Sequence, residues 1–329
     1  MTVYTDLTAR ALTVLRRGFP KDQWDELAQK IVQDRRTIEG HLREEQPSNE
    51  FAALLAQLQE RSHVGIPITL SNVEELHQYF EDQPVHRGAN ALSFDGRPKS
   101  LAAARSDFPM AAYSAETVVR APGLIDAMND PRLLHLVEQY LGCVPTLYSV
   151  NAWWSFVAPR PEMTNVQFFH RDTDDWRFVT LFIYLTDVGH DGGPHEVIPG
   201  SHTLDGMKNL LKGIPFWRPK MDAARSFVDD MGEDFSRACE HHFKAEAVQL
   251  TGPAGSMHLV NTMALHRGIV PTRTNRLVVW ARYGLGANTN SADLERGPLS
   301  VRFIPTRLQG TARDRYINRL LIDFDRGGF

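Results

Sequence analysis

The chain from about Thr146 onward is divided into short apolar or alternating segments with turn residues between them. The segments read TLYSVNAWWSFV, VQFFH, FVTLFIYLTDV, HEVIPG, EAVQL, GSMHLV, ALHRGIV and NRLVVWARYGL. Gly, Pro, Asn and Asp separate them. Many short strands with turn signals are typical of a sandwich or barrel, whereas βαβ units would alternate strands with long helical segments. The pattern therefore predicts a mainly β fold.

The first 143 residues have a helical pattern instead. In KDQWDELAQKIVQDRRTIEGHLREE the apolar residues recur at roughly 3.6 positions, and SNVEELHQYFED begins with a capping serine. Residues 84–112 are rich in Gly, Pro, Ser and Asn and predict a loop. Without an internal repeat or a clear linker, we expect one domain over residues 1–329: a mainly helical region (1–143) packed on a β core (144–290), followed by a C-terminal tail (291–329). Residues 203–243 interrupt the strands as a partly helical, lid-like insertion.

Composition excludes several classes of function. The formal net charge of −4 gives no support for nucleic-acid binding. The chain contains no run of 18 apolar residues, so we expect no transmembrane segment. The start of the chain lacks the layout of a secretory signal, and two cysteines make no disulfide framework, so we expect a cytoplasmic protein. The mildly amphipathic stretch Ala9–Phe19 leaves weak peripheral membrane contact open as an alternative to an ordinary packed helix.

Several ionisable side chains lie directly before the apolar run at 178–185. Burying such groups costs free energy unless they are paired or bind a metal. His170 and Asp172 lie two residues apart, so in an extended strand they point to the same side while Arg171 points away. An imidazole and a carboxylate presented together can hold two positions on a divalent metal. A second histidine would complete the 2-His-1-carboxylate face that suits non-haem Fe(II) oxygenases.

The segment LHRGIVPTRTNRLVVWARYG supplies a candidate for that second histidine. His266 lies in a strand-like run that is followed by a proline-containing turn and a second strand with Arg276. If the two strands form a hairpin, Arg276 reaches the metal region and presents a planar fork to a carboxylate. The competing candidates are His258 for the ligand, and Arg273 and Arg282 for the carboxylate-binding arginine.

Three motifs together resemble the phytanoyl-CoA dioxygenase family of Fe(II)/2-oxoglutarate-dependent oxygenases. They are QFFHRD before an apolar strand, YLTDVGHDGGPHEVIPGSH after it, and LHRG followed by NR near the C-terminus. The resemblance extends from about Ala121 to Tyr283. It implies a double-stranded β-helix, which is a jelly-roll, cupin-like fold, with an N-terminal helical extension and iron at one open end.

The resemblance also implies roles for individual residues. His170, Asp172 and His266 would bind Fe(II), and Arg276 would bind the distal carboxylate of 2-oxoglutarate. Residues expected near the cosubstrate are Gln167, Thr274 and Asn151. Position 268 is glycine, where some relatives have a serine, and position 195 is histidine, where the family often has an apolar residue.

The reaction that the family implies consumes O2 and converts 2-oxoglutarate to succinate and CO2 while a small molecule is oxidised. Asp172 favours hydroxylation over halogenation, because halogenating relatives lack this carboxylate; desaturation and epoxidation stay open. Two alternatives use the same scaffold. A zinc- or other metal-dependent cupin-like hydrolase or isomerase would not need Arg276, and a non-catalytic binding protein would be expected to lose a ligand.

The substrate is not identified by sequence, but aromatic and acidic residues gather near the metal motif. Trp153 shares the side of the strand on which Asn151 lies, so it is expected to face inward while Trp154 faces outward. Core packing is the competing explanation for these aromatics. A wet, polar pocket with aromatic faces would suit a sugar, a lipid-linked sugar or another hydroxylated metabolite. The residues expected to contact it are Trp153, Asp174, Asp175, Trp176 and His195.

Overall fold

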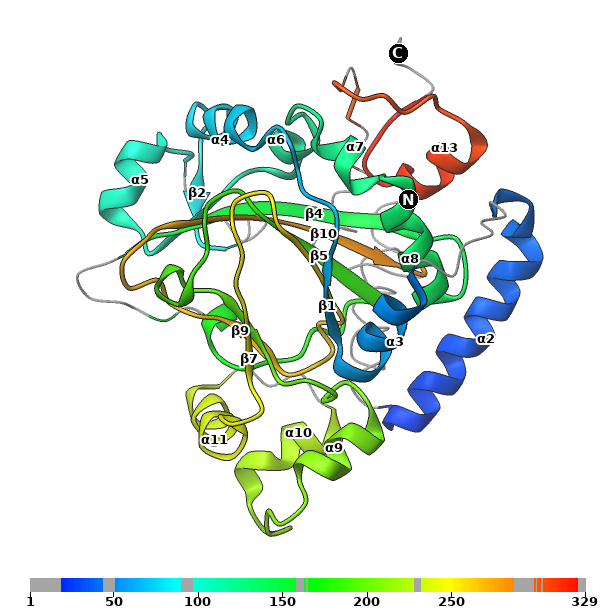
Figure 1. Cartoon of the computed structure of the whole chain (residues 1–329), viewed down its shortest axis with the longest axis vertical. Coiled ribbons are helices and arrows are strands. Elements are labelled where there is room, and N and C mark those ends of the chain that lie inside the picture. The colour runs from blue at the N-terminus through cyan, green and yellow to red at the C-terminus, as the bar shows by residue number, and fades with distance from the viewer. Residues whose placement is uncertain are drawn as a thin grey trace.

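The computed structural model contains two antiparallel β-sheets with helices packed around them (Figure 1). It describes residues 19–43, 51–89, 97–157, 163, 165–227, 232–286, 299, 301–302 and 304–324. The predicted fold class is confirmed: the chain is mainly β with a helical shell and has the two-sheet jelly-roll architecture, without closing into a barrel.

The large sheet has seven strands and the small sheet has three. The large sheet runs in the order β1 (His63–Ile66), β8 (Met257–Val260), β5 (Phe178–Tyr184), β10 (Arg276–Gly284), β4 (Thr146–Ser155), β3 (Met110–Ala112) and β2 (His86–Arg87). The small sheet runs β7 (Val248–Leu250), β6 (His195–Val197) and β9 (His266–Gly268).

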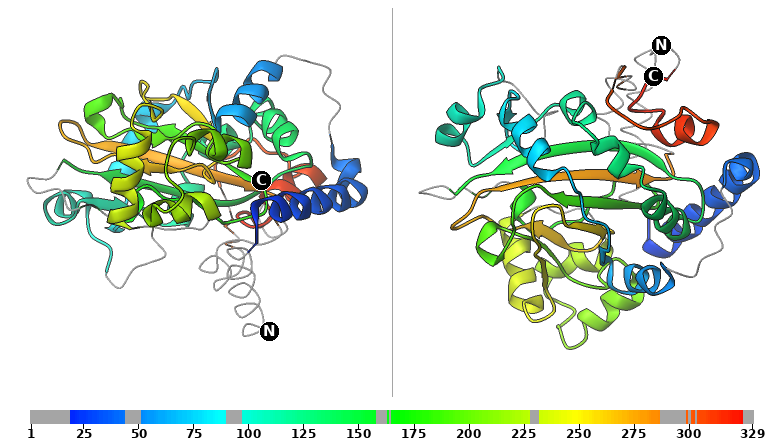
Figure 2. Two further views of the ribbon diagram at one scale, coloured as in Figure 1. Left: turned by 90° about the horizontal axis from the view of Figure 1, so that it is seen from below. Right: turned by 45° about the horizontal axis from the view of Figure 1, so that its top comes forward.

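On its outer face the large sheet is covered by α4, α6 and α7, which lie on the side of β4 away from the small sheet (Figures 1 and 2). Alternate residues of the strands explain both layers. Ala152 and Trp154 of β4 belong to the main core under the helices, whereas Trp153 packs with Tyr184 and Val278 between the sheets. The helices are α2 (Lys21–Glu39), α3 (Ala52–Arg61), α4 (Val73–Glu81), α5 (Leu101–Asp107), α6 (Ala115–Val119), α7 (Leu124–Met128), α8 (Pro131–Leu141) and α13 (Ala312–Asn318).

The N-terminal third differs from the sequence prediction because it contributes strands as well as helices. β1 pairs with β8, and β3 pairs with β4 and β2. The segment 84–112, predicted as loop, therefore contains β2, which is the edge strand, as well as β3 and α5. Strands of two to four residues are too short to show an apolar period, which is why the pattern missed them. VQFFH, predicted as a strand, instead forms the 3₁₀ turn η4 (Asn165–Gln167) and a single bridge at His170.

The insertion between β6 and β7 is helical, as predicted. It contains α9 (Leu204–Leu210), the 3₁₀ turn η6 (Pro219–Met221), α10 (Asp222–Ser226) and α11 (Glu233–Phe243). Its apolar side chains form a separate cluster with Phe169, Ile198 and Leu265 from the strand segments. In Figure 1 these helices lie below β7 and β9. The insertion therefore braces the small sheet, and its movement as a lid stays a prediction.

Within the described ranges, no helix combines the length and the apolar character needed to cross a membrane. The amphipathic stretch predicted to offer membrane contact lies outside the described residues, apart from Phe19. The remaining 3₁₀ turns of the described chain are η1 (Gly40–Leu42) and η5 (His190–Gly192).

Candidate active site

The candidate metal centre begins with a backbone pairing between His170 and His266. The amide of each residue donates to the carbonyl of the other at 3.0 Å, and this antiparallel bridge extends the small sheet beyond β9. Their chain neighbours Phe169 and Leu265 alternate to the opposite side, where they pack on the insertion. The apolar neighbours therefore fix the segments while both imidazoles face the space between the sheets.

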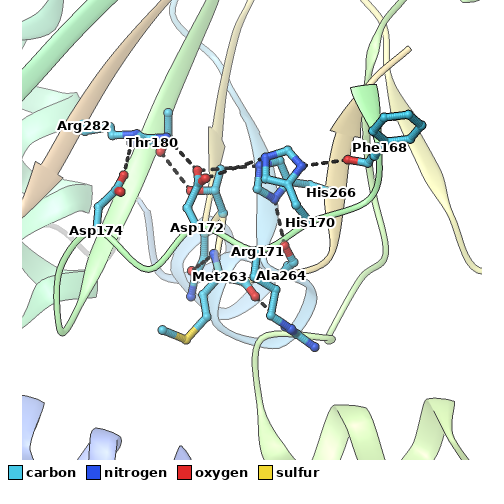
Figure 3. Close-up of polar contacts among 12 residues, drawn as sticks. Phe168, His170, Arg171, Asp172, Asp174, Thr180, Met263, Ala264, His266 and Arg282 are labelled. Carbon is cyan, nitrogen blue, oxygen red and sulfur yellow. Dashed lines mark hydrogen bonds and ion pairs between the residues drawn. The ribbon is translucent and has the colours of Figure 1, made fainter. Parts of the chain in front are cut away.

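Three potential ligand atoms converge there (Figure 3). Nε2 of His170 lies 3.7 Å from Oδ1 of Asp172, and Nε2 of His266 lies 3.7 Å from Oδ2. Nδ1 of His170 donates to the Phe168 carbonyl at 2.8 Å, and Nδ1 of His266 donates to the Ala264 carbonyl at 2.9 Å. With the proton held on Nδ1, each Nε2 presents its lone pair toward the carboxylate, as metal-binding histidines do.

The surrounding charges and the burial of the site determine the protonation states of Asp172 and His266. Burial alone would raise the pKa of Asp172, but Arg282, the two histidines and a Thr262 hydrogen bond together lower that pKa to about 2. Burial and the neighbouring His170 lower the pKa of His266 to about 4. At neutral pH the aspartate is thus ionised and the His266 ring is uncharged, which is the protonation state that metal binding requires.

Arg171 separates the two ligands in sequence and, as predicted, points away from them (Figure 3). Its guanidinium is buried and donates to the carbonyls of Ser201 (2.7 Å), Met263 and Ala224. It also lies 4.4 Å from the centre of the Phe227 ring. Arg171 thereby connects the metal segment to the insertion from behind the site.

Arg276 reaches the space between the sheets, but not through the predicted hairpin. β9 belongs to the small sheet and β10 to the large one, so the hairpin prediction is wrong. The guanidinium crosses between the sheets, where it donates to the Gly193 carbonyl and, at 3.1 Å, to Oγ of Ser155. A Cβ atom added at Gly268 would stand 3.3 Å from it. Arg276 therefore bonds both to β4 of the large sheet and to the loop that precedes β6 of the small sheet.

The residues predicted near the cosubstrate have different surroundings. Asn151 is buried on the inner face of β4 and donates to the Ala89 carbonyl at 2.7 Å. Gln167 is buried in η4, three residues before His170. Thr274 is exposed in the turn before β10, and its hydroxyl faces Gly192. Their contact with the cosubstrate stays a prediction.

Of the residues predicted to contact the substrate, the structure brings three to the inner face and places two elsewhere. Trp153 and His195 lie between the sheets, and Asp174 is paired with Arg282. Asp175 is instead fully buried and accepts from the amides of Trp176 and Gly286. The side chain of Trp176 packs against Trp24 and Phe19 in the main core. The side chains of Asp175 and Trp176 therefore lie away from the inner face, and substrate contact by the five residues stays a prediction.

Sequence reasoning missed two residues of this face. Arg282 was considered only as a rival of Arg276, yet it donates to Asp172 at 2.7 Å, contacts Asp174 and stacks over Trp280 at 4.4 Å. Ser155, the hydroxyl beside Arg276, was not considered. The signal that would have identified them is strand register: Arg276, Trp280 and Arg282 are separated by even numbers of residues in β10 and so share one face, and Arg276 lies directly opposite Ser155.

The donor set fits Fe(II). Two neutral imidazoles and one carboxylate on one side of an ion leave positions open for further ligands, as in the 2-His-1-carboxylate oxygenases. When bound, such an ion supplies the site at which O2 and a 2-oxo acid react. Among the described residues, no other group of three histidine, cysteine or carboxylate side chains is close enough to hold a metal.

The solved structures similar to this chain include the epimerase SnoN in complex with Fe3+, alpha ketoglutarate and nogalamycin RO (17% identity, covering 71% of this chain and 83% of SnoN, TM-score 0.47). HygX from Streptomyces hygroscopicus, with nickel and 2-oxoglutarate bound, shares 14% identity over 78% of this chain and 91% of its own (TM-score 0.47). EctD from S. alaskensis, with 2-oxoglutarate and 5-hydroxyectoine, shares 17% identity over 74% of this chain and 80% of its own (TM-score 0.47). No curated protein matches the sequence.

The family model described as phytanoyl-CoA dioxygenase (PhyH) matches residues 102–269, just over half of the chain. The match covers β4, the metal segment and both histidines of the candidate centre. It does not favour the zinc hydrolase or the non-catalytic binding protein that the sequence left open. The chain belongs to the phytanoyl-CoA dioxygenase family and is an Fe(II)- and 2-oxoglutarate-dependent dioxygenase.

Proposed function

We propose that His170, Asp172 and His266 bind the catalytic Fe(II), that Arg276 binds the distal carboxylate of 2-oxoglutarate, and that the enzyme hydroxylates a sugar-like small molecule. The observation that carries the proposal is the convergence of the three ligand atoms, which all lie within 4.8 Å of one another. Their geometry is fixed by a strand bridge and by two Nδ1 hydrogen bonds, so the site needs no rearrangement to accept an ion.

The environment of Arg276 supports the cosubstrate assignment. The side chain is 3% exposed, and its hydrogen-bond partners, the Gly193 carbonyl and the Ser155 hydroxyl, are both neutral. Burying a guanidinium without a counter-ion costs several kcal/mol. A bound dicarboxylate would supply that counter-ion through a two-pronged contact. Arg276 would thus hold the cosubstrate by the end that lies away from the metal.

The inner face of the large sheet supports the substrate class. Nε1 of Trp153 is buried without a hydrogen-bond partner, and half-buried Trp280 lies on the same face. Two amphipathic aromatics, one of them with a free donor, beside the Arg282–Asp174 pair suit a ligand that has hydroxyl groups and apolar ring faces. We therefore infer a sugar, a lipid-linked sugar or another hydroxylated metabolite, whose C–H bond these residues would orient while the two sheets exclude water.

The test measures iron binding and succinate formation separately. Asp172→Ala is expected to weaken Fe(II) binding, followed by anaerobic calorimetry, and to abolish the slow conversion of 2-oxoglutarate to succinate in the absence of substrate. Asp205→Ala is the matched control, because that carboxylate is exposed on α9 and pairs only with Lys208 in the described structure. Wild-type iron affinity and turnover in Asp172→Ala would refute the ligand assignment.

The substrate inference is tested by screening hydroxylated and plain acyl compounds for stimulated succinate release. Preference for a simple fatty acyl compound would contradict it.

We also infer a cytoplasmic location, supported by two buried free thiols, Cys143 and Cys239. Oxidised cysteines in the protein isolated from its own cells would contradict that location.

A further inference from the structure

The imidazole of His195 is buried between the two sheets, and its Nε2 atom has no hydrogen-bond partner. The side chain projects from β6, and the residue is 6% exposed. Its ring lies between Phe182 of the large sheet, with centroids 4.3 Å apart, and His266 of the small sheet, 5.2 Å away. A buried polar atom without a partner is costly, and in native proteins it usually marks a ligand or a water.

The strand register shows which part of the site His195 faces. His195 and Gly268 are directly paired residues of β6 and β9, so positions 195 and 268 project side chains to the same face. A Cβ atom at Gly268 would stand 3.3 Å from the Arg276 guanidinium. The face that carries His195 is therefore the face that meets Arg276, and the missing side chain at 268 leaves space beside it.

The permanent positive charge on this face is Arg276, whose guanidinium lies beside position 268, the strand partner of His195. A positive charge favours an anion next to it. An uncharged imidazole with its proton on Nε2 can donate one hydrogen bond to that anion.

We propose that His195 donates this hydrogen bond to the 2-oxoglutarate carboxylate that Arg276 binds, and thereby selects a dicarboxylate as the cosubstrate. The inference rests on the proposed function and adds a residue to its cosubstrate site. His195 contacts Phe182 and His266 through its ring faces, so both sheets hold it in place. Arg276 supplies the charge, and His195 supplies a directed donor.

The two positions at which the sequence departs from the family pattern are thus partners across one strand pair. Position 195 is histidine where the family often has an apolar residue, and position 268 is glycine where some relatives have serine. In this chain the polar group stands on β6 and the empty position on β9. Compared with relatives that have an apolar residue on β6 and a serine on β9, this chain also has one neutral donor beside Arg276, but carries it on β6.

The test compares two cosubstrates in anaerobic calorimetry of the Fe(II)-loaded protein, so that no turnover occurs. 2-Oxoglutarate has the distal carboxylate, and 2-oxobutyrate lacks it. His195→Leu is expected to raise the Kd of 2-oxoglutarate about tenfold or more, because hydrogen bonds to charged groups are worth that much. The Kd of 2-oxobutyrate is expected to stay within about twofold. His258→Leu is the matched control: its Nε2 is also buried without a partner, but it projects from β8.

A second variant distinguishes loss of the His195 hydrogen bond from general destabilisation of the protein. His195→Leu with Gly268→Ser is expected to recover most of the 2-oxoglutarate affinity, and thermal unfolding is compared for all variants. An unchanged Kd in His195→Leu, an equal loss for both ligands, or a double variant as weak as the single one would overturn the role of His195. Failure of the wild-type protein to bind 2-oxoglutarate would instead overturn the proposed function.

Discussion

Acidification is expected to destabilise the protein through His202, a buried histidine in the turn after β6. The side chain is 5% exposed, and Nε2 lies 2.9 Å from the Gln59 carbonyl, which ties the turn to α3. Burial lowers the pKa of His202 to about 4, and nearby Lys21 and Arg171 act in the same direction, against the opposing effect of the Gln59 hydrogen bond. An unfolded histidine has a pKa near 6.5.

The sign and size of the effect follow from these two pKa values. Between pH 6.5 and 4 the unfolded chain binds a proton at this position and the folded chain does not, so the free energy of unfolding falls as the pH falls. Lowering the pH from 7.5 to 5.5 is expected to remove about 1.3 kcal/mol through His202 alone, by the linkage relation. Other buried histidines add to the loss. The contribution of His202 is therefore the loss of unfolding free energy in the wild type minus the loss in a variant without this histidine.

The assay is urea unfolding of the metal-free protein at both pH values. His202→Gln keeps a side-chain amide that can donate to Gln59, and it cannot titrate. The variant is expected to lose about 1.3 kcal/mol less than the wild type on acidification. His241→Gln on the exposed side of α11 is the matched control and is expected to lose as much as the wild type. Equal losses in His202→Gln and the wild type would refute the reasoning.

Two further substitutions test the supports of the site. Gly193 has a φ of +68°, and a Cβ there would clash with the Ile269 carbonyl. Gly193→Ala is therefore expected to lower the unfolding free energy by several kcal/mol. Because the Gly193 carbonyl accepts a hydrogen bond from Arg276, the variant is also expected to weaken 2-oxoglutarate binding. Gly213→Ala, with a φ of +88° and open space, is expected to cost only about 1 kcal/mol, and similar urea midpoints for both variants would contradict the steric argument. Arg171→Met is expected to cost about 3 kcal/mol, because three carbonyls lose a charged donor and Phe227 loses its cation, and a calorimetric change below about 1 kcal/mol would contradict it.

The candidate metal ligands could be predicted because their constraint is local. His170 and Asp172 are two residues apart, and their apolar neighbours on either side indicate which way each side chain points. The same reasoning did not predict where Asp175 and Trp176 lie. The chain bends at residues 174–177, so an acidic and an aromatic residue that continue the motif in sequence are buried away from the inner face.

Arg276 lies between the two sheets, near the candidate metal centre, but the hairpin that was predicted to bring it there does not exist. The sequence suggested a hairpin between the runs at 266 and 276, but the turn between them carries the chain from the small sheet to the large one. Short-range pattern cannot distinguish these cases, because a hairpin and a crossing between two sheets use the same turn residues and the same strand composition. The neighbours that depend on sheet register, Ser155 and Arg282, could not be found without knowing which strands pair.

The alternation of side chains along 169–172 couples the insertion to the candidate metal ligands. Alternate residues of one short segment face opposite ways: Phe169 and Arg171 enter the insertion, and His170 and Asp172 face the space between the sheets. Because a one-residue shift would exchange the two sets, the free energy of packing the insertion also fixes the direction of the ligands. The insertion can therefore vary on its outer side, whereas its contacts with Phe169 and Arg171 set the geometry that metal binding needs.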